Sequence, residues 1–377
     1  MALTRRAALA ASAVTVFAIG RARAADTLKI GQVAPLTGPA AESGRYQVNG
    51  AKQAADAINA KGGVLGQQIE LVVEDDQTTN PGAVLAFSRL VNRGDCAAYI
   101  GSIRSTQVHA MAPDVLKAAK VMMFGGTDPT LTQMGNPWMF RCRPNDSYSA
   151  KVIAEFGVKS LEKKKWAIVH STDAFGTNGM KALVDSLDKA GIKPELVQGY
   201  ANQAPDFTPV VLAVKQSGAE VIGSYFTFET DLAVFARQAK QLCVTIPWIG
   251  SPSIVATPAL NLGGATLYGT YGVADFNADS SPTAKAFAEK YYELFKVRAD
   301  NFPSWTYDAT NILARGITDA GGTDPEKMRK AIIAIKGFNG AEGEYNFDEH
   351  GDGLHGYNIV RNEKGTIIFD RRIDFPA

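Results

Sequence analysis

Short apolar runs alternate with longer amphipathic stretches along this chain, and that alternation limits the possible folds more than any other feature. The first series predicts strands at 28–33, 69–73, 97–100 and 121–124, with helices at 47–60, 81–91 and 108–119. Apolar strands separated by helical stretches are typical of βαβ units. The series therefore predicts a parallel sheet with helices on both faces.

The same pattern starts again after Arg-Cys-Arg-Pro-Asn at 141–145. It predicts strands at 166–169, 195–198, 221–225 and 246–249, with helices at 148–159, 179–190, 210–216 and 231–242. Two sheets of similar size need two hydrophobic cores. We therefore expect an α/β protein with two doubly wound parallel-sheet domains.

The last third of the chain mixes helices with β-like patches. It predicts a strand at 267–273, helices at 283–295, 307–320 and 325–335, and β-like patches at 357–360 and 366–369. Ser280, Ser281 and Pro282 are typical of a helix start.

No long linker separates these parts, so we expect several closely spaced crossings between the domains. The first domain is predicted at 25–145 plus 275–354, and the second at 146–274 plus 355–377. Hinges of this kind suit closure around a ligand.

Residues 1–24 have the pattern of a secretory signal peptide. Arg5 and Arg6 precede an apolar stretch at 7–19 that is too short to span a bilayer, and Ala-Arg-Ala at 22–24 suits signal cleavage. A frayed amphipathic helix is the less favoured alternative. The Sec and Tat routes both fit, because Thr-Arg-Arg resembles a twin-arginine signal but Ala8 stands where that signal favours a bulky residue. We expect a periplasmic protein without a lipid anchor.

Composition argues against several classes of function. Charged residues make up 20% of the 377 residues, and loss of the four arginines in 1–24 would change the formal net charge from +1 to −3. The sequence has no lysine/arginine cluster with interleaved aromatic residues, which is the pattern that would indicate nucleic-acid binding. Cys96, Cys142 and Cys243 lie in or beside apolar runs without a C-x-x-C pair, so we expect buried structural thiols. We predict no metal site and no cofactor.

Two short polar loops follow two of the predicted strands. Gly-Ser-Ile-Arg-Ser-Thr occupies 101–106 and Gly-Gly-Thr-Asp-Pro-Thr occupies 125–130, each ahead of a helix-like stretch. Backbone N–H groups at a helix start, together with serine or threonine hydroxyls, suit a small anion such as a carboxylate. Because the loops lie one strand–helix unit apart, we expect them to converge on one ligand.

Five segments resemble those of branched-chain amino-acid-type periplasmic binding proteins, the solute receptors of ABC importers. They are KIGQVAPLTGP at 29–39, GGVLG at 62–66, IELVVEDD at 69–76, AFGTNG at 174–179 and YDA at 307–309. Each segment is weak evidence alone, but the set follows the family's order through nearly all of the chain after 1–24. The resemblance implies the type I periplasmic-binding fold, with the ligand in the cleft between the domains.

In that family the first domain supplies a carboxylate half-site from two loops. The resemblance assigns Ser105 and Thr106 to one loop, and Gly125 (backbone) and Thr127 (hydroxyl) to the other. Helix capping is the alternative role for Ser105 and Thr127. Arg104 is an unusual neighbour, which would pair with a ligand carboxylate, face solvent or bridge to the other domain.

The second domain is expected to cover the rest of the ligand. Family positions map onto Phe175, Phe228 and Pro252, where amino-acid binders often have two tyrosines and a nearby acidic residue. This chain has two phenylalanines and Ser251, a binding candidate, while Ser43 stands where an aromatic lid residue is common. A buried ammonium without an anionic partner would cost several kcal/mol. These departures favour a small carboxylate with an apolar, even aromatic, body over an α-amino acid.

Further aromatic residues surround the expected cleft. Phe175, Tyr225, Phe226 and Phe228 would form an aromatic wall suited to a planar acid. Because the residues of a strand alternate between its two faces, at least two of them are expected in the core.

Acidic residues near the cleft keep an amino acid open as the alternative ligand. Glu229 is the best candidate to hold a ligand ammonium. Asp231 is expected to be a helix N-cap and Asp128 a turn residue before a proline.

We expect a monomeric receptor that closes over its ligand and delivers it to the permease subunits of an ABC importer. A ligand sensor and an exported hydrolase are remoter alternatives. The chain contains no G-x-S-x-G, H-E-x-x-H, P-loop or G-x-G-x-x-G motif. His109 and His170 are expected to face the cleft side, and His350 and His355 to lie in turns. We therefore predict that the protein is not an enzyme.

Overall fold

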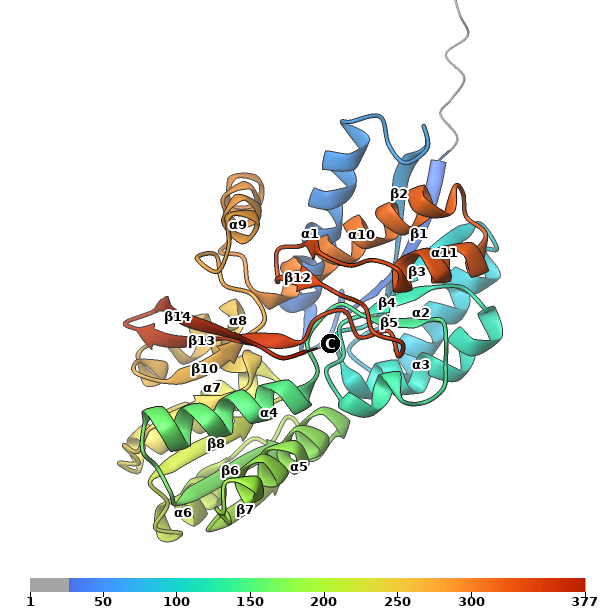
Figure 1. Cartoon of the computed structure of the whole chain (residues 1–377). Coiled ribbons are helices and arrows are strands. Elements are labelled where there is room, and N and C mark those ends of the chain that lie inside the picture. The colour runs from blue at the N-terminus through green and yellow to red at the C-terminus, as the bar shows by residue number, and fades with distance from the viewer. Residues whose placement is uncertain (1–26, 377) are drawn as a thin grey trace, which may run out of the picture.

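Two sheets, each between layers of helices, form the two domains of the molecule (Figure 1). The computed structural model of the chain describes residues 27–376, and the predicted signal peptide at 1–24 lies outside them. The domain bounds given above stay a prediction.

The first domain is built on a parallel sheet of order β2-β1-β3-β4-β5. Its strands are β1 (Thr27–Ala34), β2 (Gln68–Asp75), β3 (Cys96–Ile100), β4 (Met122–Phe124) and β5 (Met139–Arg141). Its helices are α1 (Ala41–Asn59), α2 (Asn80–Asn92), α3 (Ser105–Ala118), α10 (Asn301–Ala320) and α11 (Pro325–Ile333), with a short 3₁₀ turn η1 (Pro129–Thr132). Helices α1, α10 and α11 cover one face, and α2 and α3 cover the other (Figure 1). A small ladder of β11 (Phe338–Asn339) and β12 (Glu344–Tyr345) follows.

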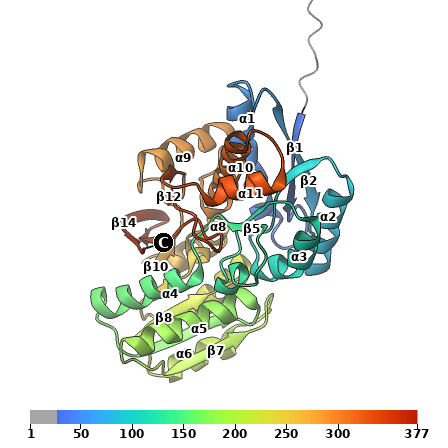
Figure 2. The same ribbon diagram turned by 45° about the vertical axis from the view of Figure 1, so that its right-hand side comes forward.

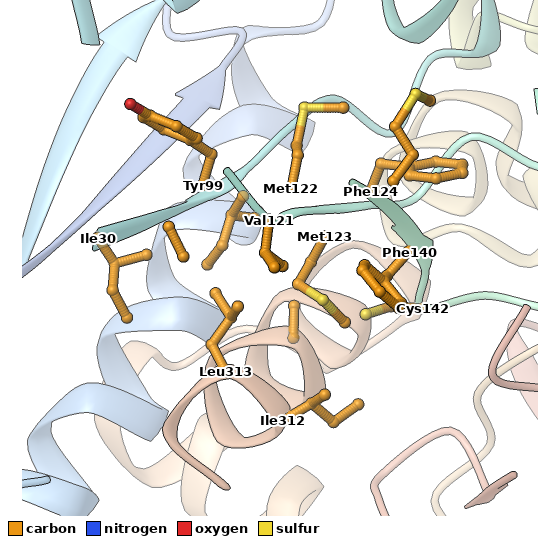
Figure 3. Packing of buried hydrophobic residues seen from close by; sticks show 14 of the residues in the cluster. Ile30, Tyr99, Val121, Met122, Met123, Phe124, Phe140, Cys142, Ile312 and Leu313 are labelled. Atoms are coloured by element: carbon orange, nitrogen blue, oxygen red, sulfur yellow. The ribbon is translucent and has the colours of Figure 1, made fainter. Parts of the chain in front are cut away.

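Both faces of this sheet are buried, which explains the continuous apolar run at 121–124. Met123 points toward Ile312 and Leu313 of α10, whereas Met122 and Phe124 point to the opposite face (Figure 3). All five side chains are fully buried. Alternation along the strand thus supplies side chains to the core on each side of the sheet.

The second domain is built on a sheet of order β14-β13-β10-β9-β8-β6-β7. Its strands are β6 (Trp166–Ser171), β7 (Leu196–Tyr200), β8 (Val221–Tyr225), β9 (Trp248–Gly250), β10 (Tyr271–Ala274), β13 (Gly356–Glu363) and β14 (Thr366–Asp374). Its helices are α4 (Asp146–Glu155), α5 (Ala174–Lys189), α6 (Thr208–Gln216), α7 (Glu229–Gln241) and α8 (Thr257–Gly263), with shorter turns η2 (Phe156–Ser160), η3 (Pro252–Val255) and η4 (Gly264–Leu267). Helices α4 and α5 pack on one face and α6 to α8 on the other. Helix α9 (Pro282–Phe295) packs beside α1 and α10 (Figure 2).

The second sheet departs from the all-parallel prediction at one edge. β13 pairs antiparallel with both β10 and β14. Only Lys364 and Gly365 connect β13 to β14, and both have positive φ (52° and 94°). A two-residue turn of this kind joins antiparallel strands, whereas parallel strands need a long crossover.

Several predicted element bounds also differ from the structure. Helix α1 begins at Ala41 rather than 47, although Gly44 in this added part has poor helix propensity. At Gly44 a Cβ would lie 1.8 Å from the Pro35 carbonyl oxygen, so close packing requires glycine at this position of the helix. The strand expected at 267–273 is divided between η4 and β10. The predicted cap of α9 is confirmed, since Ser281 Oγ accepts the Ala284 N–H at 3.0 Å.

The cysteines follow the prediction in two of three cases. Cys96 and Cys142 are buried, but Cys243 is exposed, so the expectation of burial is wrong there. Cys243 lies in the left-handed turn after α7 (φ 57°), beyond the apolar face of that helix.

The three thiols are free, and they are expected to differ in reactivity. Burial raises the pKa of the Cys142 thiol well above its ordinary value, and burial also raises that of Cys96. A colorimetric thiol reagent should therefore label Cys243 alone in the native protein and all three thiols in guanidinium. Rapid labelling of a second thiol in the native protein would contradict the burial described here.

Candidate ligand-binding site

A pocket lies between the two domains, beside the carboxyl ends of the parallel strands. Six residues predicted to bind the ligand line it: Arg104, Ser105, Thr106, Thr127, Phe175 and Glu229. Pro252, a mapped family position, also lines it, together with Ile103, Arg143, Asp173, Thr227, Ser253, Asn301 and Phe302. The loops after β3, β6 and β8 meet here, next to the points where strand order reverses in each sheet. Such points are where open α/β sheets bind ligands.

The two polar loops of the first domain are joined directly. Ser105 Oγ, at the start of α3, accepts the backbone N–H of Asp128 at 3.2 Å. The predicted alternative of helix capping is not observed for Ser105, because α3 has no side-chain cap at its start. Its hydroxyl instead links the loop after β3 to the loop after β4 and faces the pocket with its neighbour Thr106.

Arg104 spans the cleft. Its Nη1 donates to the Thr227 carbonyl oxygen of the second domain at 3.1 Å, and its guanidinium lies 4.3 Å from the centre of the Phe228 ring. Arg104 is 9% exposed, and its Nε has no hydrogen-bond partner among residues 27–376. Of the three predicted roles, the structure has Arg104 bridging the domains, with its buried Nε left without a partner.

The loop after β4 is held by two buried arginines, of which Arg143 also lines the pocket. Arg141 Nη1 donates to the Gly126 and Asp128 carbonyl oxygens, each at 2.8 Å. Arg143 Nη1 donates to the Gly125 carbonyl oxygen at 3.0 Å, and its Nε pairs with Asp275. These bonds fix the backbone that carries Thr127.

The second domain supplies aromatic and acidic walls. Phe175 packs edge-to-face on Tyr225, with ring centres 5.7 Å apart. Asp173 caps α5 by accepting the Gly176 N–H at 2.9 Å. Glu229 is the first residue of α7 and is 5% exposed. Burial raises the pKa of the Glu229 carboxyl, while the charge of Arg104 acts in the opposite direction.

Four predicted binding residues do not line the pocket. Tyr225 ends β8 on the face toward α4, where its fully buried hydroxyl bonds to Ser149 at 2.9 Å. Gly125, Phe228 and Ser251 lie next to the pocket: Gly125 against Trp305, Phe228 beneath Arg104, and the buried Ser251 before the lining Pro252. Phe226 packs with Tyr200 in the core on the opposite face from Tyr225, as strand alternation predicts.

Two aspartates near the site have structural partners. Asp128 caps η1, accepts from Asn178 of the second domain at 2.8 Å and pairs with His109 at 2.7 Å. Burial raises its pKa, but the bonds from His109 and neighbouring groups outweigh that effect and hold it below the ordinary value. The N-cap expected at Asp231 is wrong, because α7 starts at Glu229 and Asp231 accepts the Gln203 N–H from within the first turn.

The two histidines expected on the cleft side each have a partner within the fold. His109 is paired with Asp128, and a His170 ring nitrogen bonds to the Ser171 carbonyl oxygen at 2.8 Å. Within residues 27–376, no group of three or more His, Cys, Asp or Glu side chains is placed to hold a metal ion. The same part of the chain has no helix long and apolar enough to cross a membrane.

Sequence reasoning missed part of the wall for identifiable reasons. Asp173 had a usable signal, since it directly precedes the Ala-Phe-Gly segment that starts α5. Asn301 and Phe302 had no such sequence signal. They lie at the start of α10, which comes near the pocket only because the chain returns there to the first domain.

The chain passes several times between two doubly wound domains, and a polar pocket lies between them. This arrangement is that of a two-domain solute-binding protein. The chain belongs to the periplasmic binding protein family, whose sequence model matches residues 27–366. The predicted family and type I fold are thereby confirmed, and the protein is a binding protein rather than an enzyme.

Individual relatives cover nearly the whole chain. A leucine-, isoleucine-, valine-, threonine- and alanine-binding protein of Pseudomonas aeruginosa is 29% identical over 91% of each chain. A type 1 periplasmic binding protein of Bordetella pertussis is 27% identical, with a TM-score of 0.83 over 92% of this chain and 100% of the other. An ABC-transporter solute-binding protein of R. palustris, solved with benzoate, is 18% identical, with a TM-score of 0.84 over 92% and 96%.

Proposed function

We propose that this protein binds a small carboxylate with an apolar, even aromatic, body and delivers it to an ABC importer. The observation that carries the proposal is the meeting of Arg104, Ser105 and Thr127 in one pocket. A guanidinium and the Ser105 hydroxyl beside each other suit a carboxylate, because charge-assisted hydrogen bonds are the strong ones.

The rest of the pocket suits an apolar body. Ile103, Phe175, Pro252 and Phe302 contribute hydrocarbon surface to the wall. The fold is shared with a protein solved with benzoate, which supports an aromatic acid without assigning one.

An amino acid is the second candidate ligand. Glu229 and Asp173 both line the pocket, and either carboxylate would hold a ligand ammonium. The 29%-identical relative from Pseudomonas aeruginosa is named for binding leucine, isoleucine, valine, threonine and alanine. Under this alternative, Glu229 would supply the charge that the substituted family positions lack.

Calorimetric titration distinguishes the two ligand classes. We expect benzoate or a phenylpropanoate to bind more tightly than leucine. In Glu229→Gln, affinity for these acids should stay the same or rise, since a buried negative charge near the ligand is removed. Tight leucine binding that Glu229→Gln abolishes would establish the amino-acid alternative and overturn the aromatic one.

Transport would proceed by domain closure. The ligand would first contact the Ser105 and Thr127 loops, and the second domain would then close over it and form the surface recognised by the permeases. Export to the periplasm, by the Sec or the Tat route, and action as a monomer complete the proposal.

A further inference from the structure

A buried carboxyl group lies directly behind the pocket. Thr127 Oγ1 donates to Asp146 Oδ2 at 2.7 Å, and the Asp146 N–H donates to the Thr127 carbonyl oxygen at 2.8 Å. Thr127 lines the pocket, whereas Asp146 is fully buried at the start of α4. The two hydrogen bonds join a ligand loop of the first domain to a helix of the second.

The groups around Asp146 leave it without an ion-pair partner. Ser149 donates to Asp146 Oδ1 at 3.0 Å and bonds in turn to the Tyr225 hydroxyl. Arg143 and Arg141 are the nearby cations, but their Nε groups pair with Asp275 and Asp352. Tyr357 also faces this region, and its hydroxyl donates to the Pro144 carbonyl oxygen. Asp146 therefore accepts hydrogen bonds while its charge stays uncompensated by direct contact.

The Thr127 hydroxyl cannot donate to Asp146 and to a ligand carboxylate at the same time. A threonine hydroxyl has one proton to donate. In the arrangement seen here that proton goes to Asp146, so Thr127 offers an incoming carboxylate only lone pairs. An ionised Asp146 would also place a second negative charge one hydroxyl away from the ligand, with little solvent between them.

We propose that carboxylate binding in this pocket is coupled to protonation of Asp146. Asp146 takes one proton from solvent and donates it to Thr127 Oγ1, and the Thr127 hydroxyl turns its own proton to the ligand carboxylate. No covalent bond between heavy atoms changes. The inference rests on the proposed function, since it requires a carboxylate ligand.

The coupling gives affinity a defined pH dependence. Burial raises the pKa of Asp146 to about 7, against the lowering effects of Thr127 and Ser149. Below that value the proton is already present, and binding should be nearly independent of pH. Above it each binding event must take up a proton, so Kd should rise by up to about tenfold per pH unit.

Titration calorimetry at pH 8 in phosphate and in Tris, whose ionisation enthalpies differ, counts the protons. The mature chain is titrated with benzoate and with leucine. We expect uptake of about one proton per bound ligand at pH 8 and close to none at pH 5.5. Asp146→Asn should bind without uptake, because its amide donates permanently to Thr127. Asp231→Asn is the matched control, a buried aspartate outside the pocket that should retain the uptake.

The possible outcomes separate this inference from the proposed function. Binding without proton uptake, or uptake that Asp146→Asn leaves unchanged, overturns the inference and leaves the proposed function standing. Failure of both ligands to bind overturns both. If Asp146→Asn does not fold, infrared difference spectra of the wild type decide, since a protonated-carboxyl C=O band should grow when ligand is added at pH 8. Absence of that band with ligand bound would overturn the coupling.

Discussion

Arg104→Gln should weaken binding of a small carboxylate by about 10- to 100-fold. A hydrogen bond to a charged group contributes about 1.5–3 kcal/mol, and about 1.4 kcal/mol corresponds to tenfold in affinity. Arg104 is 9% exposed, so solvent screens its charge little. Glutamine keeps a donor for the Thr227 carbonyl oxygen but removes the charge. The measurement is calorimetric Kd for benzoate in both proteins.

Comparing an acid with its amide isolates the charge effect from any change in domain closure. The wild type should prefer benzoate to benzamide strongly, and Arg104→Gln should lose most of that preference. The preference of Arg104→Lys for benzoate over benzamide should lie between those of the wild type and Arg104→Gln, because lysine keeps the charge but loses the planar group stacked on Phe228. Arg315→Gln, at an exposed arginine on α10, is the control and should bind as the wild type. An unchanged preference in Arg104→Gln would reduce Arg104 to an interdomain contact.

The architecture was predictable because its local signals agree with its packing. The run at 121–124 is apolar at every position since helices cover both faces of its sheet, and such runs mark buried parallel strands. The antiparallel β13–β14 edge was not predicted. Its turn at Lys364 and Gly365 adopts left-handed backbone conformations, whereas only the β-like patches had been identified. Helix α1 was predicted too short because Gly44 lowers the helix propensity of its first turns, whereas in the structure the close approach of Pro35 requires glycine there.

The candidate site was predictable where it follows strand ends and only partly elsewhere. Arg104, Ser105 and Thr127 follow β3 and β4, so topology alone brings them together. Side-chain direction at the end of β8 was harder to predict, and Tyr225 points to the core instead of the pocket. Asp146 had no sequence signal as a neighbour of Thr127, because that contact depends on how α4 crosses between the domains.

Arg141→Met should lower the free energy of unfolding by about 3–5 kcal/mol, the usual cost of stranding one partner of a buried ion pair. Arg141 is fully buried, and its Nε pairs with Asp352 at 2.7 Å. Its loss would also remove the hydrogen bonds that Arg141 donates to the Gly126 and Asp128 carbonyl oxygens. Urea unfolding followed by circular dichroism measures the change, and carboxylate affinity should fall as the ligand loop loosens.

A double variant tests whether the stranded charge causes the loss. Adding Asp352→Leu to Arg141→Met removes the unpaired carboxylate. The double variant should therefore be more stable than the single variant, since replacing both members of a buried ion pair is often nearly neutral. Arg315→Met is the control, because its exposed pair with Asp319 should contribute less than about 1 kcal/mol. A loss in Arg141→Met no larger than in Arg315→Met would contradict this role. If the double variant recovers stability but not ligand affinity, the contacts of Arg141 with the loop carbonyl oxygens shape the pocket, and the ion pair does not.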